Sequence, residues 1–454
     1  PRTVHQHHEA KNPQRAKEPG NRCDRLFHVI LLIIGSWRRS LKPGGHTMAT
    51  VRTVRILFVT SSYPEDAADP RGIFVHRLAR RLVSHDASVT IVAPGAPGAP
   101  AREERDGVRV VRQRYWIGRW QTLTRGLAGM APNLQRRPWL LAQLPPLLVS
   151  MAWRTAVEAR RHDVVHAHWI YPAGIAAMWG ARLAGKPLVI TSHGGDLNLA
   201  GRVRVLRALS RFVSDAAAAC VGVSEAVTEG FVSIGVRPEQ VEFIPLGVDA
   251  DRTADLALLP RSESLLRFSS STGLRILYLG SLIPRKSVDT LIEAHARLEH
   301  AGHQVMTAIV GDGPAAAELA AAVRRNSLGG VIMAGSQAPS MVPAWLAGAD
   351  VLVLPSLSEG RPTVVIEAMA CGLPVVGTDI PGTRELVSEL TGFLVPPRDS
   401  DTLAQRLLEL ALNPGMREAM GQEARRKVAR DGLTTEACAR RHRELYERVL
   451  AIGR

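Results

Sequence analysis

From Val54 onward, short apolar runs alternate with longer amphipathic stretches along the chain. The runs are rich in β-branched residues, which indicates buried strands, and the stretches between them have the spacing of helices that cover a sheet. This alternation is typical of parallel strands joined by crossover helices. Strands are predicted at 54–60, 88–92, 108–113, 163–167, 187–191, 218–222, 241–244, 274–279, 304–310, 330–334, 350–354 and 374–377.

The alternation occurs twice, and both halves open alike, with VRILFVT at 54–60 and LRILYL at 274–279. A chain of 454 residues is too long for one core and suits two domains. We therefore expect an α/β protein with two Rossmann-like parallel-sheet domains. The predicted boundaries are an N-terminal domain at 48–250, a linker at 251–272, a C-terminal domain at 273–432 and a final helix at 433–454.

Residues 1–47 lack this pattern and are polar and rich in histidine and arginine, and Met48 follows them. Their one apolar run, 27–35, is far shorter than the roughly 20 residues that span a bilayer. Trp37 and two arginines follow it where a signal peptide would have small residues. We expect 1–47 to be a disordered or mis-called extension, and a weak membrane anchor is the alternative.

The positive charge of the chain is confined to its first half. Residues 1–250 hold 34 lysines and arginines against 19 acidic residues, so this half accounts for the whole net charge of +15. A basic half attracts nucleic acid, an anionic membrane or a phosphorylated substrate. The four cysteines are far apart and form no C-x-x-C pair, which indicates neither zinc nor a disulfide framework and suits a reducing cytoplasm.

Residues 107–157 carry eight arginines, four tryptophans and no acidic residue. Arginine with tryptophan and leucine is typical of a surface that binds a membrane interface. Nucleic acid is one alternative, because the same side chains stack on bases, and tryptophans that simply fill a core are another. The leucines between them and the α/β context favour an anionic membrane surface and no nucleic acid. The protein is therefore predicted to be cytoplasmic and peripheral on the inner face of the cell membrane.

The most informative polar pattern is PSLSEGRPTVVIEAMACGLPVV at 355–376. A helix is predicted to start near Pro362, because proline suits the first helical position, and to end at Gly372. Glu359 precedes this helix and Glu367 lies on it. The two carboxylates can accept hydrogen bonds from hydroxyls, while the free N–H groups and the helix dipole hold a phosphate. A nucleotide sugar has this chemistry.

These residues resemble the retaining glycosyltransferases of family 4, the group 1 glycosyltransferases, which have the GT-B fold of two Rossmann-like domains facing across a cleft. The resemblance extends from about Val54 to about Leu407. It implies that Glu367 contacts the ribose of the donor and Glu359 lies against the donor sugar. It also implies that the final helix crosses back to the N-terminal domain. The other donor-binding residues assigned in this motif are Gly360, Pro362 and Thr363.

Two further motifs follow strands of the first half, at the carboxyl edge where open α/β sheets bind ligands. Gly72 ends the loop after 54–60, and the resemblance implies that it faces the donor diphosphate and the acceptor. The sequence SHGGD follows 187–191. By resemblance, His193 lies beside the transferred sugar, whereas Asp196 either orients this loop or contacts the acceptor.

Two more motifs follow strands of the second half. Arg285 and Lys286 come after 274–279, and a lysine with an arginine at such a turn suits a diphosphate. The resemblance implies that Lys286 neutralises the leaving diphosphate, and Arg285 is assigned as the second cation because this chain has Ser281 where many relatives have arginine. Gly311 and Gly313 follow 304–310, and the resemblance places their turn near the nucleotide base.

The predicted activity is retaining transfer of a hexose-type sugar from a UDP- or GDP-sugar to a glycan or lipid-linked acceptor, in cell-envelope or exopolysaccharide biosynthesis. The catalytic residues assigned are His193, Lys286 and Glu359. We predict no metal and no cofactor, because His166 and His168 lack a third ligand and cationic groups can stabilise the leaving diphosphate. A non-catalytic nucleotide-sugar-binding scaffold at the membrane is the alternative. The sequence leaves the sugar, the base, the acceptor and the oligomeric state open.

Overall fold

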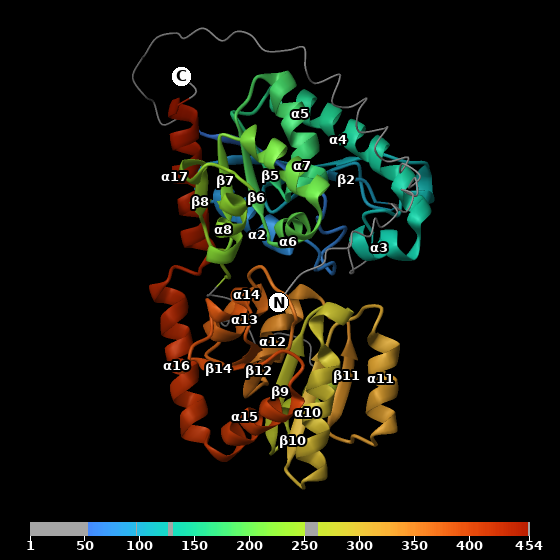
Figure 1. Cartoon of the computed structure of the whole chain (residues 1–454), viewed down its shortest axis with the longest axis vertical. Helices are drawn as coiled ribbons and strands as arrows, with labels where there is room; N and C mark the ends of the chain where they lie inside the picture. The colour runs from blue at the N-terminus through green and yellow to red at the C-terminus, as the bar shows by residue number, and fades with distance from the viewer. Residues whose placement is uncertain (1–52, 97, 126–129, 250–261, 453–454) are drawn as a thin grey trace, which may run out of the picture. The chain divides into compact units, whose positions relative to one another are not determined.

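The computed structural model describes residues 53–96, 98–125, 130–249 and 262–452 (Figure 1). The predicted extension at 1–47 and the first part of the predicted linker lie outside the described residues. The second part of that linker is helical, as α9 (Glu263–Ser269). Ser262 caps this helix by accepting a hydrogen bond from the backbone N–H of Leu265 at 3.2 Å.

The N-terminal domain is built on a sheet of eight strands in the order β3-β4-β2-β1-β5-β6-β7-β8. All neighbours are parallel except β3, which pairs antiparallel with β4. The strands are β1 (Arg55–Thr60), β2 (Ser88–Pro94), β3 (Arg102–Arg105), β4 (Val108–Gln113), β5 (Val164–His168), β6 (Leu188–Ser192), β7 (Ala219–Gly222) and β8 (Val241–Phe243). The strand order reverses direction between β1 and β5, which is where such sheets bind ligands.

The C-terminal domain is built on a parallel sheet of six strands in the order β11-β10-β9-β12-β13-β14. Its strands are β9 (Leu274–Leu279), β10 (Val305–Val310), β11 (Val331–Gly335), β12 (Val351–Leu354), β13 (Val375–Thr378) and β14 (Gly392–Val395). The reversal lies between β9 and β12. The predicted α/β class, with two parallel-sheet domains, is confirmed.

Helices cover both sheets (Figure 1). Those that accompany the first sheet are α2 (Ile73–Val83), α3 (Met130–Arg136), α4 (Leu144–Ala159), α5 (Ile175–Ala184), α6 (Gly195–Arg202), α7 (Arg204–Asp215) and α8 (Glu225–Ser233). Those that accompany the second are α10 (Val288–His300), α11 (Ala316–Arg325), α12 (Val342–Ala347), α13 (Thr363–Ala370), α14 (Pro381–Arg384), α15 (Ser400–Leu412) and α16 (Pro414–Arg430).

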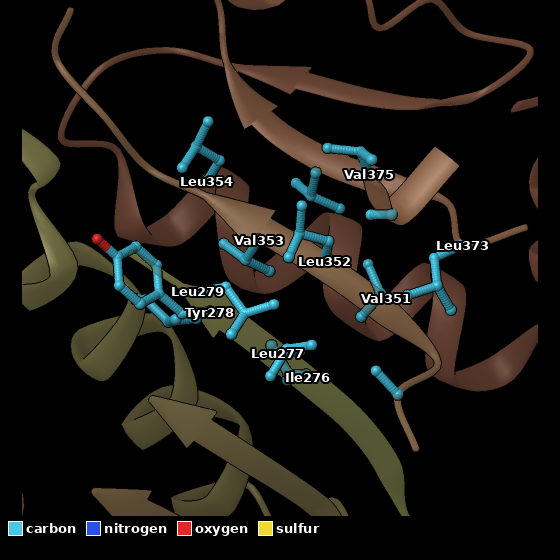
Figure 2. Close-up of a cluster of buried hydrophobic side chains, with 14 of the residues drawn as sticks. Ile276, Leu277, Tyr278, Leu279, Val351, Leu352, Val353, Leu354, Leu373 and Val375 are labelled. Carbon is cyan, nitrogen blue, oxygen red and sulfur yellow. The ribbon is translucent and has the colours of Figure 1, made fainter. Parts of the chain in front are cut away.

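Alternate residues of the central strands fill separate cores, as the two-residue period of a strand requires. On β1, Leu57 and Val59 belong to one cluster of buried residues and Ile56 and Phe58 to another. The C-terminal domain has one large core around β9 and β12, where the side chains of 276–279 and 351–354 are all buried (Figure 2). These apolar strands hold the loops at their carboxyl ends in fixed positions.

The last helix, α17 (Thr435–Ile452), packs against α2 of the N-terminal domain (Figure 1). Its buried residues Cys438, Leu445 and Tyr446 belong to the same core cluster as Ile56. The Tyr446 hydroxyl also lies 2.6 Å from Nδ1 of His166, so a residue of β5 and the last helix are hydrogen-bonded. The C-terminal helix thus completes the core of the N-terminal domain.

Candidate functional site

The segment that carries Glu359 and Glu367 forms a loop after β12, followed by α13. The helix begins at Thr363, one residue later than proline at the first helical position would require, because Pro362 has an extended backbone and serves as the N-cap. Gly372, with φ of 78°, follows the last turn as predicted. Glu359 therefore lies in the loop and Glu367 on the helix.

Glu359 and Lys286 form an ion pair in which Nζ and Oε1 are 2.6 Å apart. Their side chains are only 8% and 13% exposed. Burial alone would raise the pKa of Glu359, but the charges of Lys286 and Arg285 lower it, so the carboxylate is ionised. Arg285 also donates to the carbonyl oxygen of Ser358 at 2.8 Å. The turn after β9 and the loop after β12 are thus brought together, and three of the predicted site residues meet there.

Glu367 is paired with a residue that sequence reasoning missed. Arg77, on α2 of the N-terminal domain, donates from Nη1 to Oε1 of Glu367 at 2.6 Å. The Arg77 side chain is buried, and its Nε has no partner among the described residues. The three arginines of α2 lie within the short sequence RLARRL, and only the structure distinguishes the buried Arg77 from Arg80 and Arg81.

His193 follows β6 and is held between two aromatic rings. Its ring centroid lies 4.7 Å from that of Phe74 and 4.7 Å from that of Trp169. Nε2 is 3.3 Å from Nδ1 of His168, and the buried Nδ1 of His193 has no partner among the described residues. Burial lowers the pKa of His193 to about 3, so the imidazole is neutral at ordinary pH.

Asp196 organises the loop that carries His193. Its carboxylate accepts from the backbone N–H of Ile170 at 2.8 Å and from that of Leu197 at 3.1 Å, and it is hydrogen-bonded to the Ser192 hydroxyl. Burial raises the pKa of Asp196. Of its two predicted roles, orienting the loop is the one that these contacts support.

The His193 loop and the Glu359 loop approach closely through two glycines. A Cβ atom on Gly360 would lie 2.1 Å from the carbonyl oxygen of His193, and one on Gly194 would lie 2.8 Å from the Cα of Gly360. Any side chain at either position would force the loops apart. This contact brings the sugar-site residues predicted on the two domains to one place.

The other predicted glycines are needed by the backbone itself. Gly72 is the N-cap of α2 with φ of 64°, and a Cβ there would lie 2.3 Å from the carbonyl oxygen of Ser62. A Cβ on Gly311 or Gly313 would lie 1.8 Å from Gly280 oxygen or 2.4 Å from Leu282 oxygen, respectively. These close contacts require glycine with or without a ligand.

A second contact between the loops of the two sheets involves residues that the sequence did not single out. The Glu385 carboxylate accepts from the backbone N–H groups of Glu225 and Ala226, both at 3.1 Å, at the start of α8. Arg361, which is buried beside Gly360, donates to the same carboxylate at 2.8 Å. The signal for this pair was weak, because an arginine next to a glycine in a loop usually faces solvent.

The tryptophans of 107–157 do not fill a core, so that alternative is wrong. Trp120, Trp139 and Trp153 are 57%, 53% and 66% exposed, and Trp116 is exposed as well. Leu141 and Val149, in the same segment, are also exposed. None of the described helices is both long enough and apolar enough to cross a bilayer.

His166 and His168 have partners other than a metal. His166 contacts Tyr446 and the Thr191 hydroxyl, and His168 contacts His193. Within the described ranges, no group of three or more His, Cys, Asp or Glu residues is arranged to hold a metal ion.

Two Rossmann-like sheets with polar residues gathered at their carboxyl edges define the GT-B class of proteins. Residues 273–413 match the family model of the group 1 glycosyl transferases, and residues 72–247 match that of the glycosyl transferase 4-like domain. The chain belongs to the group 1 glycosyltransferases.

Several of the relatives that the chain resembles are named as glycosyltransferases. It is 28% identical over 367 residues to the putative teichuronic acid biosynthesis glycosyltransferase TuaC of Bacillus subtilis, covering 78% of this chain and 88% of TuaC. It is 27% identical over 390 residues to a GDP-mannose-dependent phosphatidylinositol monomannoside mannosyltransferase of Mycobacterium tuberculosis, covering 82% and 93%. The structure of Anabaena HepE with UDP-glucose matches with a TM-score of 0.68 and 20% identity, covering 87% of this chain and 99% of HepE.

Proposed function

We propose that the protein transfers a hexose-type sugar from a UDP- or GDP-sugar to a glycan or lipid-linked acceptor in cell-envelope or exopolysaccharide assembly. The observation that carries this proposal is the buried Lys286–Glu359 pair beside the start of α13. The names of the relatives support it, since one is named as GDP-mannose-dependent and another as a putative glycosyltransferase of teichuronic acid biosynthesis. The structure of HepE with UDP-glucose supports a uridine nucleotide as the alternative donor.

We infer a retaining reaction at this site. The bond from C1 of the sugar to the diphosphate oxygen breaks, and the bond from the acceptor oxygen to C1 forms on the same face. The departing phosphate oxygen takes the proton of the acceptor hydroxyl, so no separate nucleophile is needed. Lys286, Arg285 and the free N–H groups of α13 stabilise the developing charge, in place of a divalent cation.

The remaining side chains position the donor. Glu359, which is ionised, accepts from a sugar hydroxyl, and the free Nδ1 of the neutral His193 gives a second contact to the sugar. Glu367 accepts from the ribose hydroxyls, which requires that it exchange Arg77 for the nucleoside. Lys286 likewise turns from Glu359 toward the diphosphate when the donor binds.

A panel of UDP-, GDP- and ADP-sugars tests the donor class by thermal shift. A ligand at a hundredfold excess over its Kd stabilises the folded state by about 2.7 kcal/mol, so the true donor should raise the melting temperature clearly more than the other sugars. Turnover of that donor should persist in EDTA. Absence of any shift with all three classes would refute the proposal, whereas a shift without transfer to any acceptor would favour the scaffold alternative.

We also propose that the exposed tryptophans of 107–157, together with exposed arginines such as Arg114 and Arg119, bind an anionic membrane surface, which would present a lipid-linked acceptor. The support is the exposure of Trp120, Trp139 and Trp153 within a segment that has no acidic residue. Tryptophan is favoured at the headgroup level of a bilayer, and each arginine near an anionic leaflet contributes about 1 kcal/mol.

A further inference from the structure

A cavity of about 660 Å³ opens beside the loop that leads from β1 to Gly72. Its volume falls within the range of small-molecule sites. Neither Lys286 nor Glu359 lines it, so it is separate from the predicted diphosphate site. The charged residues that line it are Glu65, Asp66, Asp69, Arg71, Arg125, Arg136 and Arg137.

Two acidic residues on one side of the cavity are paired with Arg71, which also lines the cavity. Arg71 is paired with Asp69 at 2.7 Å and with Glu65, and it also donates to the carbonyl oxygen of Thr124 at 3.2 Å. Burial opposes the charge of Arg71, but the two carboxylates more than compensate and raise its pKa. The Glu65 carboxylate can still accept hydrogen bonds from hydroxyl groups, because it has acceptor sites beyond the one that Arg71 uses. The Asp69 oxygens are already filled, because they accept from Arg71 and from the backbone N–H of Glu65.

Among the described residues, the arginines on the other side of the cavity are not all paired with acidic residues. Arg136 and Arg137, at the end of α3, are exposed and have no ion-pair partner in the described part of the chain. Arg125 lies 3.6 Å from Glu65 with 41% of its side chain exposed. Asn133 fixes this wall, because its Nδ2 donates to the carbonyl oxygens of Leu123 at 3.1 Å and Arg125 at 2.6 Å.

We infer that this cavity binds the acceptor and selects an anionic sugar. Arg136 and Arg137 hold a phosphate or carboxylate group, for which the guanidinium fork is suited. Glu65 accepts from a hydroxyl group of the same sugar. A neutral sugar would bind the Glu65 carboxylate but would leave Arg136 and Arg137 without a counter-charge. This inference rests on the proposed function, since it supplies the acceptor of that reaction.

The test compares Arg136→Gln/Arg137→Gln with a matched control, Arg324→Gln/Arg325→Gln, which removes the same charge from the exposed end of α11. The probes are glucose 6-phosphate, glucuronic acid and methyl glucoside, with binding measured by ligand-observed NMR. The unchanged protein and the control should bind the two anionic probes at least tenfold more tightly than the neutral one. The test variant should lose this preference and keep its thermal shift with the donor.

Two outcomes would overturn the inference. One is equal binding of anionic and neutral probes by the unchanged protein, and the other is an unaltered preference in the test variant. Phosphatidylglycerol vesicles distinguish a lipid headgroup from a sugar anion. If the test variant lost only vesicle binding, the arginines would belong to the membrane surface. If no nucleotide sugar raises the melting temperature, the proposed function itself is refuted. If a nucleotide sugar raises it but the protein shows no preference for the anionic probes, only this inference is refuted.

Discussion

At the scale of single residues, Lys286 has two roles that a variant can separate. It neutralises a buried carboxylate in the free protein and, under the proposed function, the departing diphosphate during transfer. Lys286→Ala should therefore lower both the melting temperature and kcat. Loss of one group that stabilises transition-state charge typically lowers kcat by about 10²- to 10³-fold. Thermal melts and initial rates measure the two effects.

The double variant Lys286→Ala/Glu359→Gln controls for stability, because it removes the unpaired buried charge. Its melting temperature should return toward that of the unchanged protein while kcat stays low. Recovery of kcat together with stability would contradict a catalytic role for Lys286.

Glu367 and Arg77 form a second pair, and the two partners should behave differently. Glu367→Ala should raise the donor Kd by about tenfold or more, equivalent to about 1.4 kcal/mol, because contacts to the ribose are lost. Arg77→Met should leave the donor Kd unchanged or lower it, because Glu367 no longer has to exchange a partner. Calorimetric titration with the donor distinguishes these outcomes. Equal weakening in both variants would mean that the pair only holds the loops in place.

The sequence was sufficient to place the candidate residues but not to pair them. Glu359 and Lys286 each follow a strand of the second sheet, and parallel strands end at one edge of their sheet, so their meeting was predictable. Arg77 and Glu385 were not predictable, because each side chain acquires its partner from a segment more than 150 residues away. Such pairs depend on how the loops of both sheets meet, which no local pattern contains.

At the scale of elements, the other strands were predicted and two edge strands, β3 and β14, were missed. β3 has the sequence REER and only its pairing with β4 makes it a strand, so it shows no apolar run. β14 is a short edge strand, GFLV, whose glycine lies against Val375 of its neighbour. Strands at the edge of a sheet bury less surface than central ones, and their sequences therefore carry a weaker pattern.

The segment from β4 to α4 should bind anionic vesicles. Replacement of Trp120, Trp139 and Trp153 by serine should reduce sedimentation with phosphatidylglycerol vesicles several-fold, because tryptophan anchors at the interface. Leu412→Ser, which changes an equally exposed residue of α15, is the control and should change nothing. Binding of the unchanged protein should weaken with salt. Equal, negligible binding to neutral and anionic vesicles would contradict the prediction.

At the scale of the whole molecule, stability should fall steeply in mild acid. Burial, together with neighbouring histidines, holds the pKa values of His166 and His168 well below normal, and burial lowers those of His193 and His442 to about 3 and about 4. Below pH 6.5 these histidines take up protons in the unfolded chain but stay neutral in the folded protein. Their contribution to stability is therefore fully present above this pH and is lost as pH falls. Each such histidine lowers the free energy of unfolding by about 1 kcal/mol between pH 7 and 5.5.

Thermal melts across this range test the prediction. The melting temperature should fall as pH decreases from 7 to 5.5, and His442→Gln should make that fall smaller, because one titrating group is removed. Carboxylates of lowered pKa, such as Glu359, add to the loss only at more acidic pH. A melting temperature that stays constant down to pH 5.5 would contradict neutral buried histidines.

The return of α17 to the first sheet has a consequence for how the chain is made. The strands of that sheet have all left the ribosome soon after Phe243, yet Val164, Val189 and Val221 share a core with Tyr446, which is synthesised some two hundred residues later. At roughly 5–20 residues per second, translation takes on the order of 10–40 s to cover that interval. Throughout it an apolar face of the nascent first domain stays open to water and to chaperones, so the domain that is translated first is the last to finish folding.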